Sequence, residues 1–174
     1  MTLAALLLAA GLLLPFLLGQ TQILGQAISP LHIPVLLCGL TCGWSWGAAL
    51  GVVLPLLRSI LFGMPPMSAA IPMAFEMAAY GALSGLLYPL FRRLNRSRSH
   101  LPAMLSTMII AMIAGRLVGG VAKACVMGLQ GGSYTFQAFV AAYFTGTAVG
   151  AAVHLIVVPA VALALEKAKL SPRA

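Results

Sequence analysis

Residues Leu31 to Pro66 read LHIPVLLCGLTCGWSWGAALGVVLPLLRSILFGMPP, and this stretch decides the fold class of the chain. Arg58 is its single Lys, Arg, Asp or Glu, so the stretch cannot lie on a water-exposed surface. One membrane crossing takes about 20 apolar residues, so we expect two crossings joined by a tight turn at Trp44 to Trp46. A glycine at every fourth position predicts a strip without side chains along one helical face, where a neighbouring backbone can approach closely. These glycines are Gly39, Gly43, Gly47 and Gly51.

The composition extends this conclusion to the whole chain of 174 residues. Charged residues make up 7% of it and hydrophobic residues 61%, whereas a soluble domain carries about 25% charged residues. We therefore expect an all-α integral membrane protein, in which a bundle of six transmembrane helices forms a single domain over 1–174. The net charge of +8 lies mostly in two clusters beside apolar segments, which is typical of membrane topology and contact with anionic lipid. It does not indicate binding to nucleic acid.

Six apolar segments and the two basic clusters agree on one topology. The clusters are the loop RRLNRSRSH at 92–100 and the tail EKAKLSPRA at 166–174. Short basic loops stay in the cytoplasm, so both termini of this multi-pass protein are expected on the cytoplasmic side of the cell membrane. A cleaved signal peptide is an alternative interpretation of the first segment. However, no basic residue precedes that segment and no small-residue cleavage site follows it. The expected helices are 3–18, 31–46, 48–62, 71–91, 101–127 and 139–165.

Four charged side chains lie inside the apolar segments, where each costs roughly 2.5–3.5 kcal/mol at a helix centre. With the topology above, all four fall in the outer half of the membrane, and such residues mark candidate functional sites. An internal ion pair between Glu76 and Arg58 is one explanation. The alternative is an anionic ligand, because three cations accompany one carboxylate and arginine suits carboxylates and phosphates. The four residues are Arg58, Glu76, Arg116 and Lys123.

Polar residues near the outer ends of these helices complete a candidate small-molecule pocket. Tyr80 follows Glu76 by one helical turn, and Tyr143 lies early in the last segment, so either can line such a pocket. Two glycines would let the loop at 128–137 move as a lid. The polar and aromatic residues of that loop are Gln130, Ser133, Tyr134 and Gln137, and its glycines are Gly131 and Gly132.

Three further residues allow more than one interpretation. His154 is either a packed histidine bonded to a backbone carbonyl, or a ligand contact or proton relay. Cys38 and Cys42 share a helical face, and we interpret them as small buried hydrophobic residues, because a metal site needs more ligands nearby. No metal ion and no cofactor are expected.

These features resemble the substrate-binding S components of energy-coupling factor (ECF) vitamin transporters. The resemblance covers nearly the whole chain: six helices, both ends inside, and the small-residue face of Ala5 and Ala9 in the first helix. Its most specific part is LHIPVLLCGLTCGWSWGAALGVVLPLLRSILFGMPP, followed by EMAAYGALSGLLY at 76–88. This part is similar to members with an "IPV…G…G…G" second and third helix, which are often assigned to pantothenate or left without a substrate.

The resemblance implies a mechanism that residue spacing does not show. An S component is not an enzyme: it captures a vitamin outside, joins a membrane coupling protein and two cytoplasmic ATPases, and topples to release the vitamin when ATP is hydrolysed. The alanine face of the first helix docks on the coupling protein, and Ala5 with Ala9 matches that pattern. The family's pocket is built from helices four to six and the outer loops. The implied substrate-binding residues are Glu76, Tyr80, Arg116, Lys123, Gln130 and Tyr134, with Arg58 as a neighbour.

Two other classes of function fit the sequence less well. An intramembrane enzyme would use Glu76 as acid or base and Arg116 on a phosphate, but the chain has no Asp and no histidine near Glu76 in sequence. A self-contained transporter usually shows repeated halves, and no convincing internal repeat is present.

Overall fold

The computed structural model describes residues 2–17, 29–95, 99–132 and 134–168, and within these ranges the chain forms helices and no strands. The all-α prediction is therefore confirmed. The segment 18–28, part of the arginine-rich loop, Ser133 and the tail from 169 onward lie outside the described residues. The helices are α1 (Thr2–Leu17), α3 (His32–Cys42), α4 (Trp44–Phe62), α5 (Met67–Leu94), α6 (Leu101–Leu129), α7 (Phe136–Val140) and α8 (Ala148–Lys167), with a π-helical segment (Ala141–Thr145) between α7 and α8.

Four helical segments in the described part of the chain are long and apolar enough to cross a membrane: α4, α5, α6 and the run Phe136–Lys167. The helices α1 and α3 are also apolar but shorter, with 16 and 11 residues. A helix rises 1.5 Å per residue, so α3 reaches only about 17 Å across a hydrocarbon layer of about 30 Å. The helix that the sequence predicts over 31–46 is therefore too long, and the observed helix α3 is shorter.

The chain breaks between α3 and α4 at Gly43, whose φ of 108° is a conformation that other residues rarely adopt. Its N–H bonds back to the carbonyls of Cys38 and Gly39, which closes the end of α3. Trp44 and Trp46 belong to the first turn of α4 and are about half exposed. The turn therefore comes earlier than the expected Trp44–Trp46 position, because glycine alone tolerates this backbone geometry.

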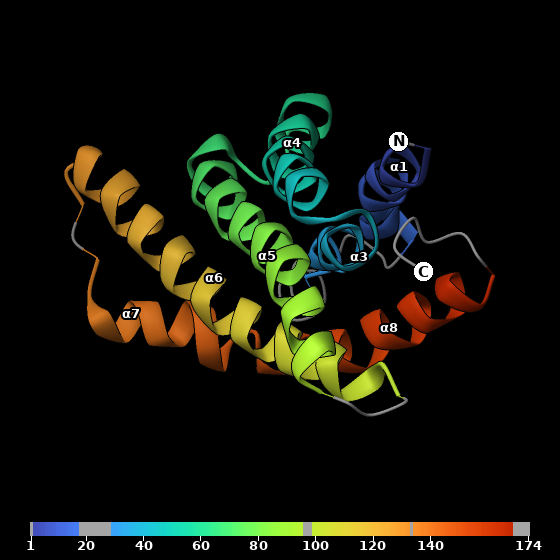
Figure 1. Ribbon diagram of the computed structural model, residues 1–174. Coiled ribbons are helices and arrows are strands. Elements are labelled where there is room, and N and C mark those ends of the chain that lie inside the picture. Colours follow the sequence, from blue (N-terminus) through green and yellow to red (C-terminus); the bar gives the residue numbers. More distant parts are fainter. Residues whose placement is uncertain (1, 18–28, 96–98, 133, 169–174) are drawn as a thin grey trace.

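The glycine-rich stretch lets two helices, α3 and α4, pack closely on α5, which lies between α4 and α6 in Figure 1. A Cβ atom added to Gly47 of α4 would lie 2.5 Å from the carbonyl oxygen of Gly81 in α5. A Cβ on Gly39 of α3 would approach the same oxygen to 2.5 Å. The sequence predicts that the four glycines form one helical stripe. The structure differs, because Gly43 divides them between two helices. Both parts nevertheless face α5.

The short helix α3 forms the centre of the protein and contacts α1, α4, α5 and α8. Val35, Leu36 and Cys38 on it are completely buried. The run from α7 to α8 passes along one side of the other helices (Figure 1). This arrangement brings the first turn of α3 next to the middle of α5 and to α8, where the polar residues of the protein interior gather.

Candidate functional site

A buried polar cluster lies where α3, α5, α6 and α8 meet, and we define it as His32, Glu76, Tyr80, Arg116 and His154. The Tyr80 hydroxyl donates a hydrogen bond of 2.5 Å to Oε1 of Glu76. Nε2 of His32 lies 3.9 Å from the same oxygen. His32, Glu76, Tyr80 and His154 are each at most 9% exposed. Ionisable groups this deep in an apolar helical protein are costly, so the cluster is the strongest candidate for a functional site.

Two glycines of α6 make room for the cluster. Glu76 and Tyr80 project from the same face of α5, one turn apart, toward α6. Gly115 lies against the Tyr80 ring, and a Cβ atom on Gly119 would lie 2.8 Å from Cβ of Glu76. Any larger side chain at either position would displace these residues, so the glycines fix how closely α6 approaches the carboxylate.

His32 joins the cluster from the first turn of α3. Its Nδ1 lies 3.0 Å from the carbonyl oxygen of Ser29, which only accepts hydrogen bonds, so Nδ1 carries the proton. In the neutral ring Nε2 is then an acceptor that faces Glu76. The ring centroid lies 5.2 Å from that of Tyr80 and 5.6 Å from that of His154. The backbone of α3 thus sets both the tautomer and the orientation of the ring.

Arg116 supplies the positive charge of the cluster and is partly buried. Its Nη2 donates a 3.5 Å hydrogen bond to the carbonyl of Thr147, and the guanidinium lies 5.6 Å from the Phe144 ring centroid. It also lies close enough to Tyr80 and Glu76 to act on both electrostatically. Among the described residues each carboxylate lies within ion-pair distance of a histidine, His32 for Glu76 and His100 for Glu166, and these rings carry a charge only when protonated; Arg116 is near Glu76 without being paired to it.

Two tyrosines of the following segment approach the cluster from the side of α7. The ring of Tyr143 lies beside Gly119, next to Glu76. The hydroxyl of Tyr134 is buried and has no hydrogen-bond partner among the described residues. Burial, and then the charge of Glu76, raise the pKa of Tyr134 above its usual range. Tyr134 therefore offers a neutral hydroxyl donor in a place shielded from water.

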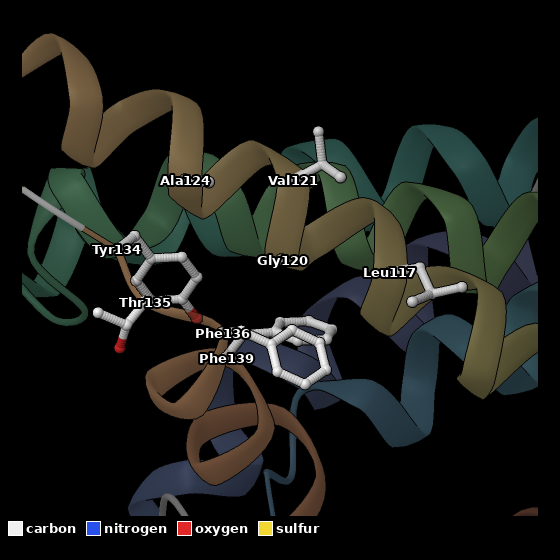
Figure 2. Close-up of a pocket in the computed structure, with 8 residues that line it drawn as sticks. All are labelled: Leu117, Gly120, Val121, Ala124, Tyr134, Thr135, Phe136 and Phe139. Carbon is white, nitrogen blue, oxygen red and sulfur yellow. The ribbon is translucent and has the colours of Figure 1, made fainter.

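An apolar groove of about 350 Å³ opens beside the cluster, between α6 and the segment that leads into α7. Figure 2 shows Tyr134, Phe136 and Phe139 gathered along α6 at this groove. The Phe139 ring centroid lies 5.4 Å from that of Tyr143, which connects the groove wall to the cluster. This volume falls within the range of small-molecule sites. The lining residues are Leu117, Gly120, Val121, Ala124, Tyr134, Thr135, Phe136 and Phe139.

The structure brings Glu76, Tyr80 and Arg116 together, and Tyr134 within electrostatic range of Glu76. It does not bring Arg58 to them. Arg58 is buried against α1, where Nη1 lies 3.4 Å from the Leu12 carbonyl oxygen and the guanidinium lies 5.3 Å from the Phe16 ring centroid.

The ion pair of Arg58 with Glu76, one of the two explanations that the sequence allows, is therefore absent among the described contacts, and the His32 ring lies 3.9 Å from the carboxylate instead. Lys123 and Gln130 lie farther along α6 toward the loop, where Lys123 is partly and Gln130 largely exposed. Neither of them contacts the cluster in the described structure.

Sequence reasoning missed His32 and left His154 undecided. The signal for His32 was available, because it is an ionisable residue at the start of an apolar stretch, as Arg58 is within it. Its proximity to Glu76 was not available, because α3 and α5 are separated by a whole helix in sequence. The ring contact of His154 with His32 places that residue in the same cluster.

Comparison with known proteins identifies the family. A family model described as "ECF transporter, substrate-specific component" matches residues 1–165, nearly the whole chain. A search of curated proteins and a search of solved structures each give no match. Members of this family bind a substrate for membrane transport and are not enzymes, which agrees with the apolar helices and with the buried polar cluster. The chain belongs to the family of substrate-specific components of ECF transporters.

Proposed function

We propose that this protein captures a water-soluble vitamin or vitamin precursor outside the cell with high affinity and delivers it across the cell membrane. The observation that carries the proposal is the buried polar cluster, with Glu76, Tyr80 and Arg116 packed together inside an otherwise apolar helical protein. A structural role alone does not account for four nearly inaccessible polar side chains on three helices. Substrate binding does, because a polar ligand satisfies groups that lipid and apolar side chains cannot.

The proposed substrate carries an anionic group, as pantothenate does. Arg116 is the cation for this group, since it lies in the cluster without a carboxylate partner among the described residues. Guanidinium groups recognise carboxylates and phosphates with two parallel hydrogen bonds. Tyr134 is proposed to close over the bound substrate, while Lys123 and Gln130 lie toward the proposed entrance.

The proposed transport cycle needs partners that hydrolyse ATP: a membrane coupling protein and two cytoplasmic ATPases. Support for a docking face comes from α1, where Ala5 and Ala9 are exposed while Ala4 and Leu7 are buried against the bundle. A face of small side chains allows another helix to approach closely. In this proposal six helices form the membrane bundle, including the short α3, and both termini are cytoplasmic.

Titration calorimetry on the purified protein in lipid nanodiscs tests the proposal, with a panel of water-soluble vitamins and their precursors as ligands. We expect at least one of them to bind with a dissociation constant below about 1 μM. Absence of binding by every member of the panel would refute the proposed function.

The variant Arg116→Ala tests the role of the cation. Losing a charge-assisted hydrogen bond should weaken binding of an anionic vitamin about tenfold or more. Arg93→Ala is the matched control, because Arg93 is an exposed arginine near the end of α5. If both variants have the thermal stability of the wild type and bind the vitamin with equal affinity, Arg116 does not bind the substrate.

A further inference from the structure

We infer that the substrate is bipolar: it presents an anionic group to Arg116 and, at a neighbouring position, an N–H or O–H donor to Glu76 and His32. This inference rests on the proposed function and narrows its substrate to a chemical class. Hydroxy acids, amino acids and acids that carry an amide or ureido group belong to this class. A simple anion and a simple cation do not.

The charges that face the cluster are fewer in the structure than the sequence suggests. The sequence gives three cations and one carboxylate in the outer helix halves, which favours a plain anion. The structure leaves one of each beside the cluster: Arg58, on α4, is buried against α1, and Lys123 is seven residues from Arg116, which is about 10 Å farther along the helix. A plain anion beside Arg116 would then meet an uncompensated Glu76, and like charges this close repel each other.

The two opposite charges of the cluster, on Glu76 and Arg116, are held by separate partners. Glu76 accepts from the Tyr80 hydroxyl, while Arg116 donates to the Thr147 carbonyl and faces the Phe144 ring. Each charge thus has partners of its own and the two form no ion pair in the described structure. Buried charges are normally paired, because removing each from water is costly. A substrate that presents an anionic group to Arg116 and a donor to Glu76 gives each of them the complementary partner that it lacks.

Glu76 and His32 together favour a hydrogen-bond donor on the substrate. Oε1 of Glu76 and Nε2 of His32 lie 3.9 Å apart, and in the neutral imidazole both atoms are acceptors, since Nδ1 donates to the Ser29 carbonyl. Two acceptors at this spacing repel each other slightly and both attract a shared donor. An N–H or O–H of the substrate between them satisfies both atoms, whereas a further acceptor satisfies neither.

The experiment compares ligands that carry one or both of these groups on the wild-type protein in nanodiscs. Pantothenate and biotin carry an anion and donors, nicotinate carries the anion without an N–H or O–H donor, pantothenol carries donors without the anion, and thiamine is a cation. These five accompany the vitamin panel in calorimetry. We expect the tightest ligand of the whole panel to carry both groups. Nicotinate and pantothenol should bind at least about tenfold more weakly than that ligand, because each leaves one buried group unsatisfied.

The variant Glu76→Gln distinguishes a bipolar substrate from a plain anion by the direction in which the ligand affinity changes. It keeps the size of the side chain and removes the charge. If Glu76 accepts from the substrate, the affinity for the tightest ligand falls about tenfold. If the site binds a plain anion, affinity rises because a repelling charge is gone.

Glu166→Gln is the matched control for this variant. Glu166 is the only other acidic residue of the chain, and it is bonded to His100 and Tyr88 near the C-terminal end of α8. This control should leave the affinity unchanged within about twofold.

The outcomes separate the inference from the proposed function. If no vitamin binds the wild type, the proposed function fails and the inference falls with it. If a vitamin binds but the tightest ligand lacks either group, or if Glu76→Gln tightens binding or leaves it unchanged, the inference alone is wrong. The comparison of ligands on the wild type needs no variant, so it remains decisive if Glu76→Gln does not fold.

Discussion

The cluster can form because residue 119 is glycine and therefore has no side chain. Glu76 fills the space that a side chain at Gly119 would occupy, and the ring of Tyr143 lies 3.1 Å from the same point. Helix propensity alone disfavours glycine in the middle of α6 by about 1 kcal/mol relative to alanine. The close approach of α6 to the carboxylate explains why this position needs glycine.

We predict that Gly119→Ala weakens substrate binding about tenfold or more, because the new methyl group displaces Glu76 from its position beside Tyr80 and His32. Calorimetry with the tightest ligand measures this. The control is Gly128→Ala on the same helix, where an added Cβ meets nothing within 4 Å. Equal affinities of the two variants would contradict the proposed placement of the substrate.

At the scale of elements, the packing of α4 on α5 depends on backbone contact between two glycines. Cβ atoms on Gly47 and Gly81 would each approach the carbonyl oxygen of the other residue. Helices that touch through their backbones gain dispersion contacts over a long crossing, which is a main source of helix association within membranes. The same closeness leaves little freedom for any side chain in that interface.

Gly81→Ala should therefore destabilise the protein by about 1–3 kcal/mol, since an overpacked interface must separate to admit the methyl group. Thermal unfolding in nanodiscs, followed by circular dichroism, measures the change. Gly128→Ala again serves as control and should be neutral or slightly stabilising, because alanine favours a helix more than glycine does. A stability of Gly81→Ala equal to that of the wild type would show that α4 can shift away without cost.

At the scale of the whole molecule, one part of α1 stands apart from the rest of the apolar surface. Ala5 and Ala9 are exposed on the same face of α1, whereas Ala4 and Leu7 hold the helix against α3 and its neighbours. The cluster lies where α3, α5, α6 and α8 meet. Docking and substrate binding are therefore expected to respond to different substitutions.

We predict that the double variant Ala5→Leu, Ala9→Leu binds substrate like the wild type but abolishes uptake of radiolabelled vitamin in cells that express the complete transporter. The larger side chains prevent another helix from approaching this face. Ala160→Leu on the exposed side of α8 is the control and should leave uptake unchanged. Normal uptake by the double variant would place the docking face elsewhere.

The helix class and the membrane environment follow from sequence, because long apolar runs with few charges have no other stable arrangement in lipid. The exact ends of the helices were harder to predict from the sequence. The break at Gly43 depends on a backbone conformation that helical periodicity does not predict, and in the folded protein α3 and α4 on either side of it both pack on α5. Glycine at that position permits the break, but the spacing of four residues also suited a continuous helix.

The sequence by itself determined that ionisable residues lie within apolar helices, that Glu76 and Tyr80 share one face of α5, and that Arg116 belongs to α6. Spacing within one helix is fixed by 3.6 residues per turn. Only the tertiary structure decided which helices present these residues to one another. It separated Arg58 from Glu76 and brought His32 within 3.9 Å of the carboxylate. The physical reason is that contacts between helices depend on close backbone packing at glycines, which local periodicity does not encode.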